Sequence, residues 1–221
     1  WKHFGVDYEP AGKEHHAAGG SWDTGKEISK VFDYDPPISI AYEFVFLKGK
    51  KGKMSSSEGD VLLVKDLLKV MEPEVLRYLY SKSRPKSELW LDLGLGLLDS
   101  YDHFDDLEEN YFEENIDQED KRVYEHSRIE IPENKPAHPP YRFLATLVQI
   151  PNLETDRIIE ILQNNDHFPN EPSEKDIKKL ERRLNLASNW IKEHAPDSVK
   201  FKIRENPPKV NITKKQGKFL G

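Results

Sequence analysis

The chain of 221 residues contains no cysteine. This absence excludes a disulfide framework, zinc bound through thiolates and a cysteine nucleophile. The chain also lacks any apolar run near the roughly 20 residues that a membrane span needs, and no signal-peptide pattern opens it. These absences predict a soluble, cytoplasmic protein with no membrane partner, long enough for one or two domains.

Basic side chains are outnumbered by acidic ones, 33 to 40, but they gather in two places. The formal net charge of −7 would ordinarily argue against a nucleic-acid partner. However, residues 92–134 hold fifteen acidic and only three basic side chains, so the remainder of the chain is net basic. The basic side chains gather at Lys48, Lys50, Lys51 and Lys53, and again in the tail 199–221. Each cluster is either a solvated face or a site for phosphates.

Hydrophobic periodicity predicts an α/β beginning and a helical remainder. Strands are expected at 4–9 and 38–47, with a helix near 24–32 between them. Helical patterns follow at 57–71, from Pro73 onward, and at 97–111, 141–150, 154–164 and 174–194. Ser173 is the expected N-cap of the last helix. The polar, proline-containing stretch 115–140 is expected to be a linker or a crossing segment.

The stretch from Lys48 to Ser57, KGKKGKMSSS, carries the clearest chemistry. A glycine-flanked loop after a buried strand offers mobile ammonium groups, hydroxyls and backbone N–H donors. These groups hold a polyphosphate whose charge grows during a reaction. Lysine, glycine and serine also make ordinary surface hairpins, so composition alone leaves both interpretations open.

Five residues within this stretch are more specific. Lys53-Met54-Ser55-Ser56-Ser57 resembles the KMSKS signature of class I aminoacyl-tRNA synthetases, in its KMSSS variant. The strand before it and the helical segment 60–77 after it are similar to that family as well. Upstream, residues 1–25 resemble the archaeal-type class I lysyl-tRNA synthetases, and the resemblance extends over most of the chain.

The resemblance implies three parts. They are the C-terminal part of a Rossmann-type catalytic domain with the KMSSS loop in 1–59, a helical stem-contact fold and acidic linker in 60–130, and the start of an α-helical anticodon-binding domain in 131–221. The family's other signature, His-x-Gly-His, is absent from the chain, which begins at Trp1. We therefore expect a fragment that lacks the N-terminal half of the catalytic domain and is inactive alone.

The resemblance also implies site residues. In the family, a Gly-Lys-Asp-His segment lies beside the ATP ribose and the amino acid. Gly12, Lys13 and His15 match it, while Glu14 stands in place of the aspartate. The implied ATP-binding residues are Gly12, Glu14, Lys53, Met54, Ser55, Ser56 and Ser57; Lys53, Ser55 and Ser56 are the implied catalytic residues.

His15 and Tyr42 fall where the family places residues around the lysine substrate. Without the resemblance, His15 and His16 would be interpreted as a pair of loop histidines, one of them packed. Two adjacent histidines do not make a zinc site, and no third ligand stands at a suitable spacing, so no metal site is expected.

The implied reaction has two steps. The carboxylate of lysine attacks the α-phosphate of ATP, with Mg²⁺ as the ion bound to ATP, and yields lysyl-adenylate and pyrophosphate. The lysyl group then moves to the 3′ end of tRNA(Lys). Lys53 would neutralise charge on the leaving pyrophosphate, with further charge from Lys50, Lys51 or Mg²⁺. The alternatives are a cysteinyl- or glutamyl-type class I synthetase, or a non-catalytic helical module that binds tRNA or protein.

Two weaker patterns are interpreted as packing. Gly94-Leu95-Gly96 does not extend to a third glycine, because Asp99 stands there, so it is not expected to bind a dinucleotide. Trp190 could stack on a base, but its place in the helical pattern favours the core or its flank.

Overall fold

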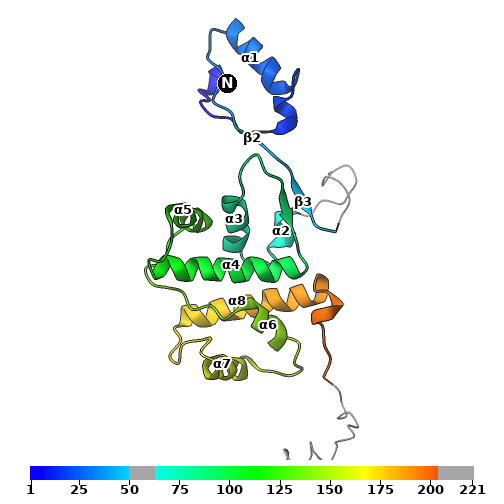
Figure 1. Ribbon diagram of the computed structural model, residues 1–221, viewed down its shortest axis with the longest axis vertical. Helices are drawn as coiled ribbons and strands as arrows, with labels where there is room; N and C mark the ends of the chain where they lie inside the picture. Colours follow the sequence, from blue (N-terminus) through cyan, green and yellow to red (C-terminus); the bar gives the residue numbers. More distant parts are fainter. Residues whose placement is uncertain (50–62, 204–221) are drawn as a thin grey trace, which may run out of the picture.

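The computed structural model describes residues 1–49 and 63–203. Figure 1 shows a small N-terminal body at one end of the molecule, joined through the strands β2 and β3 to a larger helical part. In the helical part, the long helices α4 and α8 lie one beneath the other (Figure 1). No helix within the described ranges is both long enough and apolar enough to cross a membrane.

The N-terminal body is a small βαβ unit. Its elements are a 3₁₀ turn η1 (Lys2–Phe4), β1 (Ala11–Gly12), η2 (Lys13–His16), α1 (Ser21–Val31) and β2 (Ala41–Tyr42). β1 and β2 are parallel, with Gly12 opposite Tyr42. The predicted helix is confirmed and begins a few residues earlier than expected. The strand expected at 4–9 is wrong, because that region contributes only an isolated bridge between Tyr8 and Ile38.

The strand expected over 38–47 divides into two. Its first part is β2, and its second part, β3 (Val45–Leu47), pairs in parallel with β4 (Leu89–Leu91) in a separate sheet. The change of partner occurs at Glu43, whose backbone N–H donates to the carbonyl of Pro85 at 2.8 Å. Residue composition predicted the extended conformation correctly, but it carried no information on which segment each half would pair with.

Seven helices are described after β3. They are α2 (Val64–Leu67), α3 (Pro73–Lys82), α4 (Leu95–Phe112), α5 (Gln118–Ser127), α6 (Tyr141–Leu147), α7 (Thr155–Asn164) and α8 (Glu174–Glu193), followed by a 3₁₀ turn η4 (Asp197–Val199). Pro73 occupies the first turn of α3, as predicted. Ser173 caps α8 in a full capping box with Asp176.

The stretch 115–140 is more than a linker, because it contains α5. Asp117 caps this helix by accepting from the N–H of Asp120 at 2.8 Å. The helix packs on α3 and buries Val123 and Tyr124. Hydrophobic periodicity did not predict this helix, because few apolar side chains stand in this strongly charged stretch.

One hydrophobic core runs through the helical part. Its buried residues extend from Leu67 to Ala195 and come from α2, α3, β4 and every later helix. Trp190 is fully buried, and its indole N–H donates to the carbonyl of Leu93 at 2.7 Å, which confirms its predicted place in the core. Gly96 is a packing residue as predicted, because a Cβ atom there would lie 2.5 Å from the Cβ of Asp92.

Over residues 1–49 and 63–203, the architecture is mostly helical with two small parallel sheets, compatible with a Rossmann-like beginning followed by helices. The boundaries at 59/60 and 130/131 stay predictions.

Candidate functional site

The N-terminal body brings together the described residues of the predicted substrate site. β1 ends at Gly12 and the neighbouring parallel strand β2 ends at Tyr42. A Cβ atom on Gly12 would lie 3.5 Å from Glu14 Oε2, 3.8 Å from His15 Cδ2 and 3.9 Å from Tyr42 Cε2. Glycine thus leaves a small space between three side chains at the carboxyl ends of two parallel strands, where α/β folds commonly bind ligands.

A tight turn orients this group of side chains. A Cβ atom on Gly20 would lie only 2.6 Å from the carbonyl oxygen of His15 and 2.8 Å from that of Ala17. Glycine therefore permits η2 to fold back against the beginning of α1. Across this turn, His15 Nδ1 and Ser21 Oγ are 2.8 Å apart. His15 is exposed, and its ring is held at one edge by the first residue of α1.

The two adjacent histidines have different surroundings. His16 is half-buried, with Nε2 2.8 Å from Ser39 Oγ, and its ring lies 5.6 Å from that of Trp22. His16 therefore connects η2, α1 and the segment before β2, whereas His15 points its ring toward Gly12. The interpretation of one packed histidine and one exposed histidine agrees with these contacts.

Lys13 connects the same turn to the residue after β2. Its ammonium group is 2.6 Å from Glu43 Oε2 and 5.2 Å from the centre of the Phe44 ring. The hydrogen bond to Glu43 raises the pKa of Lys13 above its usual value. The sequence pattern contained no signal for this pair.

The predicted signature loop itself lies outside the described residues. This holds for Lys53, Met54, Ser55, Ser56 and Ser57, and for Lys50 and Lys51.

The described chain before residue 50 is anchored to β4. The backbone N–H of Lys48 donates to the carbonyl of Leu91 at 2.8 Å, and its ammonium group is 2.9 Å from Asp92 Oδ2. Although partial burial by itself would raise it, the pKa of Asp92 is lowered by the hydrogen bond from Lys48 and by backbone donors. Lys48, one of the four lysines of the first basic cluster, is thus already paired with a carboxylate.

No metal cluster is found within residues 1–49 and 63–203, where no three histidine or carboxylate side chains are placed to hold an ion. The described candidate site offers carboxylate, imidazole and phenol groups. These groups are suited to hydrogen-bond hydroxyl, ammonium and carboxylate groups of a small ligand.

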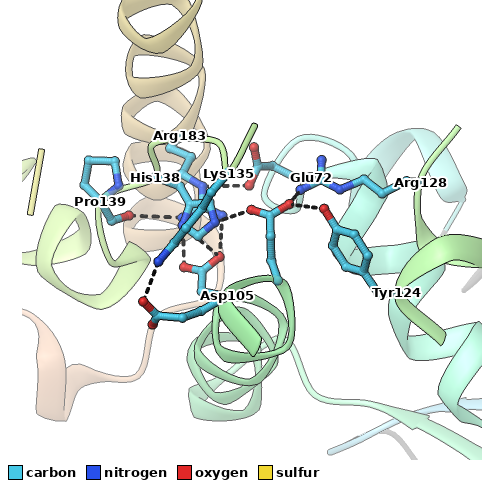
Figure 2. A network of polar contacts seen from close by, with 10 residues as sticks. Glu72, Asp105, Tyr124, Arg128, Lys135, His138, Pro139 and Arg183 are labelled. Carbon is cyan, nitrogen blue, oxygen red and sulfur yellow. Dashed lines mark hydrogen bonds and ion pairs between the residues drawn. The ribbon is translucent and has the colours of Figure 1, made fainter. Parts of the chain in front are cut away.

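A buried polar network in the helical part had no counterpart in the sequence predictions. Figure 2 shows Arg183 of α8 between Glu72, at the beginning of α3, and Asp105 of α4. The guanidinium donates to Glu72 at 2.7 Å, to the two oxygens of Asp105 at 2.9 and 2.8 Å and to the carbonyl of Pro139 at 3.0 Å. The carboxylates of Glu72 and Asp105 outweigh its burial and raise the pKa of Arg183.

A second carboxylate of α4 organises the other half of this network. Glu108 is fully buried and accepts from the hydroxyl of Tyr124 at 2.8 Å. It also forms contacts with Arg128 and with Nε2 of His138. Because Arg128 already balances the charge of Glu108, His138 can remain neutral. Burial lowers the pKa of His138 to about 4, although Asp105 acts in the opposite direction.

The sequence contains one weak indication of this network, the position of Arg183 in the helical pattern. Arg183 stands three residues after Leu180 and four before Ala187, at the spacing of the buried stripe of α8. A charged residue at such a position indicates a buried partner of opposite charge. The sequence gives no means of choosing Glu72 and Asp105 from the other acidic residues.

Comparison with known proteins places these features in a family. The model of the family described as tRNA synthetases class I (K) matches residues 1–130. Lysine–tRNA ligase of Thermococcus kodakarensis is 50% identical over 96% of this chain, and that of Pyrococcus horikoshii is 49% identical over 96%. Lysine–tRNA ligase of Methanopyrus kandleri is 39% identical over 100% of this chain.

The chain spans about two fifths of the length of these relatives, 42% of the first two and 41% of the third. The family match extends from the βαβ unit with its Gly12 site through α5, which is more than half of the residues. The chain therefore belongs to the class I (K) tRNA synthetase family.

Proposed function

We propose that the whole protein is a lysine–tRNA ligase that activates lysine with ATP and transfers it to tRNA(Lys) in the cytoplasm. The observation that carries this proposal is the 50% identity to a lysine–tRNA ligase over 96% of this chain. The grouping of Gly12, Glu14, His15 and Tyr42 at the ends of two parallel strands supports it.

In the first step, the carboxylate of lysine attacks the α-phosphate of ATP and pyrophosphate leaves. Gly12 and Glu14 are the proposed contacts to the ATP ribose, because a carboxylate accepts from hydroxyls and glycine lets a ligand approach the backbone. His15 and Tyr42 are the proposed contacts to lysine. Both rings lie beside the position that a Gly12 Cβ would take, with His15 Cδ2 at 3.8 Å and Tyr42 Cε2 at 3.9 Å from it.

Lys53, Ser55 and Ser56 are the proposed catalytic residues, on the sequence resemblance alone, with Met54 and Ser57 as further contacts to ATP. A lysine at the leaving pyrophosphate stabilises negative charge that develops in the transition state. Mg²⁺ would accompany ATP and neutralise its phosphates. The pairing of Lys48 with Asp92 supports a fixed entry of the chain into this segment.

The helical part is proposed to contact tRNA, with a stem-contact fold in 60–130 and the beginning of an anticodon-binding domain in 131–221. The observation that supports this division is the family match, which ends at residue 130 while the similarity to the ligases continues.

The test is amino-acid-dependent pyrophosphate exchange by the full-length protein. We expect exchange with lysine and none with cysteine or glutamate. Lys53→Ala is expected to lower kcat about 100-fold, because one positioned donor to a transition-state charge is worth that much.

Lys30→Ala is the matched control for Lys53→Ala. Lys30 is an exposed lysine of α1 whose ammonium group is paired with Glu27 at 2.8 Å. Its removal should leave kcat unchanged. Exchange that depends on another amino acid, or an unaffected Lys53→Ala variant, would refute the proposal.

A further inference from the structure

The turn between α2 and α3 is held by side chains that come much later in the chain. Lys69 and Val70 form this turn just after α2 ends at Leu67. The carbonyl of Lys69 accepts from Asn189 Nδ2 of α8 at 3.0 Å, and the carbonyl of Val70 accepts from the hydroxyl of Tyr141 of α6 at 2.9 Å. The carbonyls that follow a helix need such partners, and here they are supplied by the C-terminal helices.

The end of the same turn is held by the buried charge network. The N–H of Glu72 donates to the hydroxyl of Tyr101 at 2.9 Å, and its carboxylate accepts from Arg183 at 2.7 Å. Val70, Tyr101 and Arg183 have no exposed surface, and Glu72 is 4% exposed. A shift of the turn would leave buried donors and acceptors without partners, which is costly, so the turn has one position relative to α8.

Helix α8 also binds the backbone just after β4, the strand that pairs with β3. Trp190, the residue after Asn189, donates its indole N–H to the carbonyl of Leu93 at 2.7 Å. Leu93 follows β4, and β4 holds the end of β3 through the bond from Lys48 to Leu91. Adjacent residues of α8 thus bind the turn that follows α2 and the residues that follow β4, the strand that pairs with β3.

We propose that Asn189 and Tyr141 are positioning residues for the activation of lysine, although both belong to the helices beyond the family match. The C-terminal helices set the separation and orientation of β3 and α2, which flank the proposed ATP-binding signature. This inference rests on the proposed function. Neither residue touches ATP or lysine; each acts through the turn at Lys69 and Val70.

The test is single-turnover formation of lysyl-adenylate by the full-length protein. Asn189→Leu removes one donor with little change in volume, and Tyr141→Phe removes only a hydroxyl. We expect each variant to lower the first-order rate constant about fivefold, the effect of losing one net hydrogen bond. A merely structural role would lower the amplitude through a smaller active fraction and leave the rate constant unchanged.

Two controls separate positioning from stability. Asn185→Leu makes the same substitution one turn earlier on the exposed side of α8 and should leave the rate constant unchanged. Leu162→Ala destabilises the buried side of α7 without touching the turn, and should lower the amplitude only.

A second readout needs no activity. In the present chain, Asn189→Leu should speed amide hydrogen exchange in α2 and leave exchange in α7 unchanged.

Rate constants of Asn189→Leu and Tyr141→Phe equal to that of the wild type would overturn the positioning role. If the wild-type protein forms no lysyl-adenylate from lysine and ATP, the proposed function fails, and the role of α8 in lysine activation fails with it. Adenylate formation that is normal in the wild type and unchanged in both variants refutes the positioning role alone.

Discussion

At the scale of single residues, the helical part depends on charges placed inside it. Arg183 is fully buried and satisfies its donors with two carboxylates and a backbone carbonyl. Removing one partner of such a pair leaves an uncompensated buried charge, which costs far more than the pair contributes. The network therefore acts mainly to specify how α3, α4 and α8 fit together.

His138 makes the stability of this network depend on pH. Its folded pKa of about 4 lies below the usual value of roughly 6.5, so the folded state binds fewer protons than the unfolded state between these values. Stability from this group is complete above pH 6.5 or so and is lost as the pH falls toward 4. Between about pH 7.5 and about pH 5, the loss from His138 amounts to about 2 kcal/mol.

The variant His138→Gln keeps a donor toward Glu108. We expect its free energy of unfolding to fall by about 2 kcal/mol less than that of the wild type over that pH interval. Urea unfolding at the two pH values measures this difference. His103→Gln, on the exposed side of α4, is the matched control and should retain the wild-type pH dependence. A His138→Gln variant with the full wild-type loss would show that His138 is not kept neutral.

At the scale of elements, the beginnings of helices could be predicted from the sequence because they depend on neighbouring residues. Ser173 accepts from the N–H of Asp176, and the carboxylate of Asp176 accepts from the N–H of Ser173 at 2.9 Å. Both bonds join residues three apart, so spacing alone predicts them. The pairing of the β-strands could not be predicted in the same way, since the change of partner at Glu43 depends on a carbonyl more than 40 residues later.

Ser173→Ala should destabilise the chain by about 1 kcal/mol, because the N–H of Asp176 loses its acceptor. Chemical denaturation measures the change. Ser188→Ala, in the interior of the same helix, is the control and should have little effect, since alanine is the better helix former. Equal losses from both substitutions would contradict the capping role.

At the scale of the whole molecule, the family match and the core have different extents. The family match ends at residue 130, yet the core that begins in α2 and α3 is completed by Tyr141, Leu180 and Trp190. Tyr101 and Tyr141 stack with ring centres 3.8 Å apart across this limit. The helical part is thus expected to unfold as one cooperative unit.

Substitutions on the two sides of residue 130 should therefore shift the same transition. Leu98→Ala in α4 and Leu162→Ala in α7 each remove a buried side chain and should cost about 2–5 kcal/mol. Hydrogen exchange in α3 and in α8 should report the same midpoint in both variants. Two separate transitions, each sensitive to only one substitution, would show instead that 60–130 and 131–221 fold independently.

Part of the candidate site could be predicted from sequence. Gly12, Glu14, His15 and Tyr42 were named from a resemblance, and the structure places all four within one small region. The contacts of Lys13 with Glu43 and of His16 with Ser39 could not be predicted, because they join residues 23 to 30 positions apart without a spacing rule. Lys53 and its neighbours lie outside the described residues, so their placement stays a prediction.

The absence of cysteine, the uneven charge, the helix caps and the KMSSS string were determined by the sequence itself, since each is a property of residues near one another in the chain. The family follows from such local strings as well, because similarity is read residue by residue. Only the tertiary structure decided that Arg183 pairs with Glu72, 111 residues away, and that Asn189 and Trp190 bind the backbone after α2 and after β4. Those contacts form because a packed interior must satisfy every buried polar group, and the partner it selects depends on how all the helices fit together.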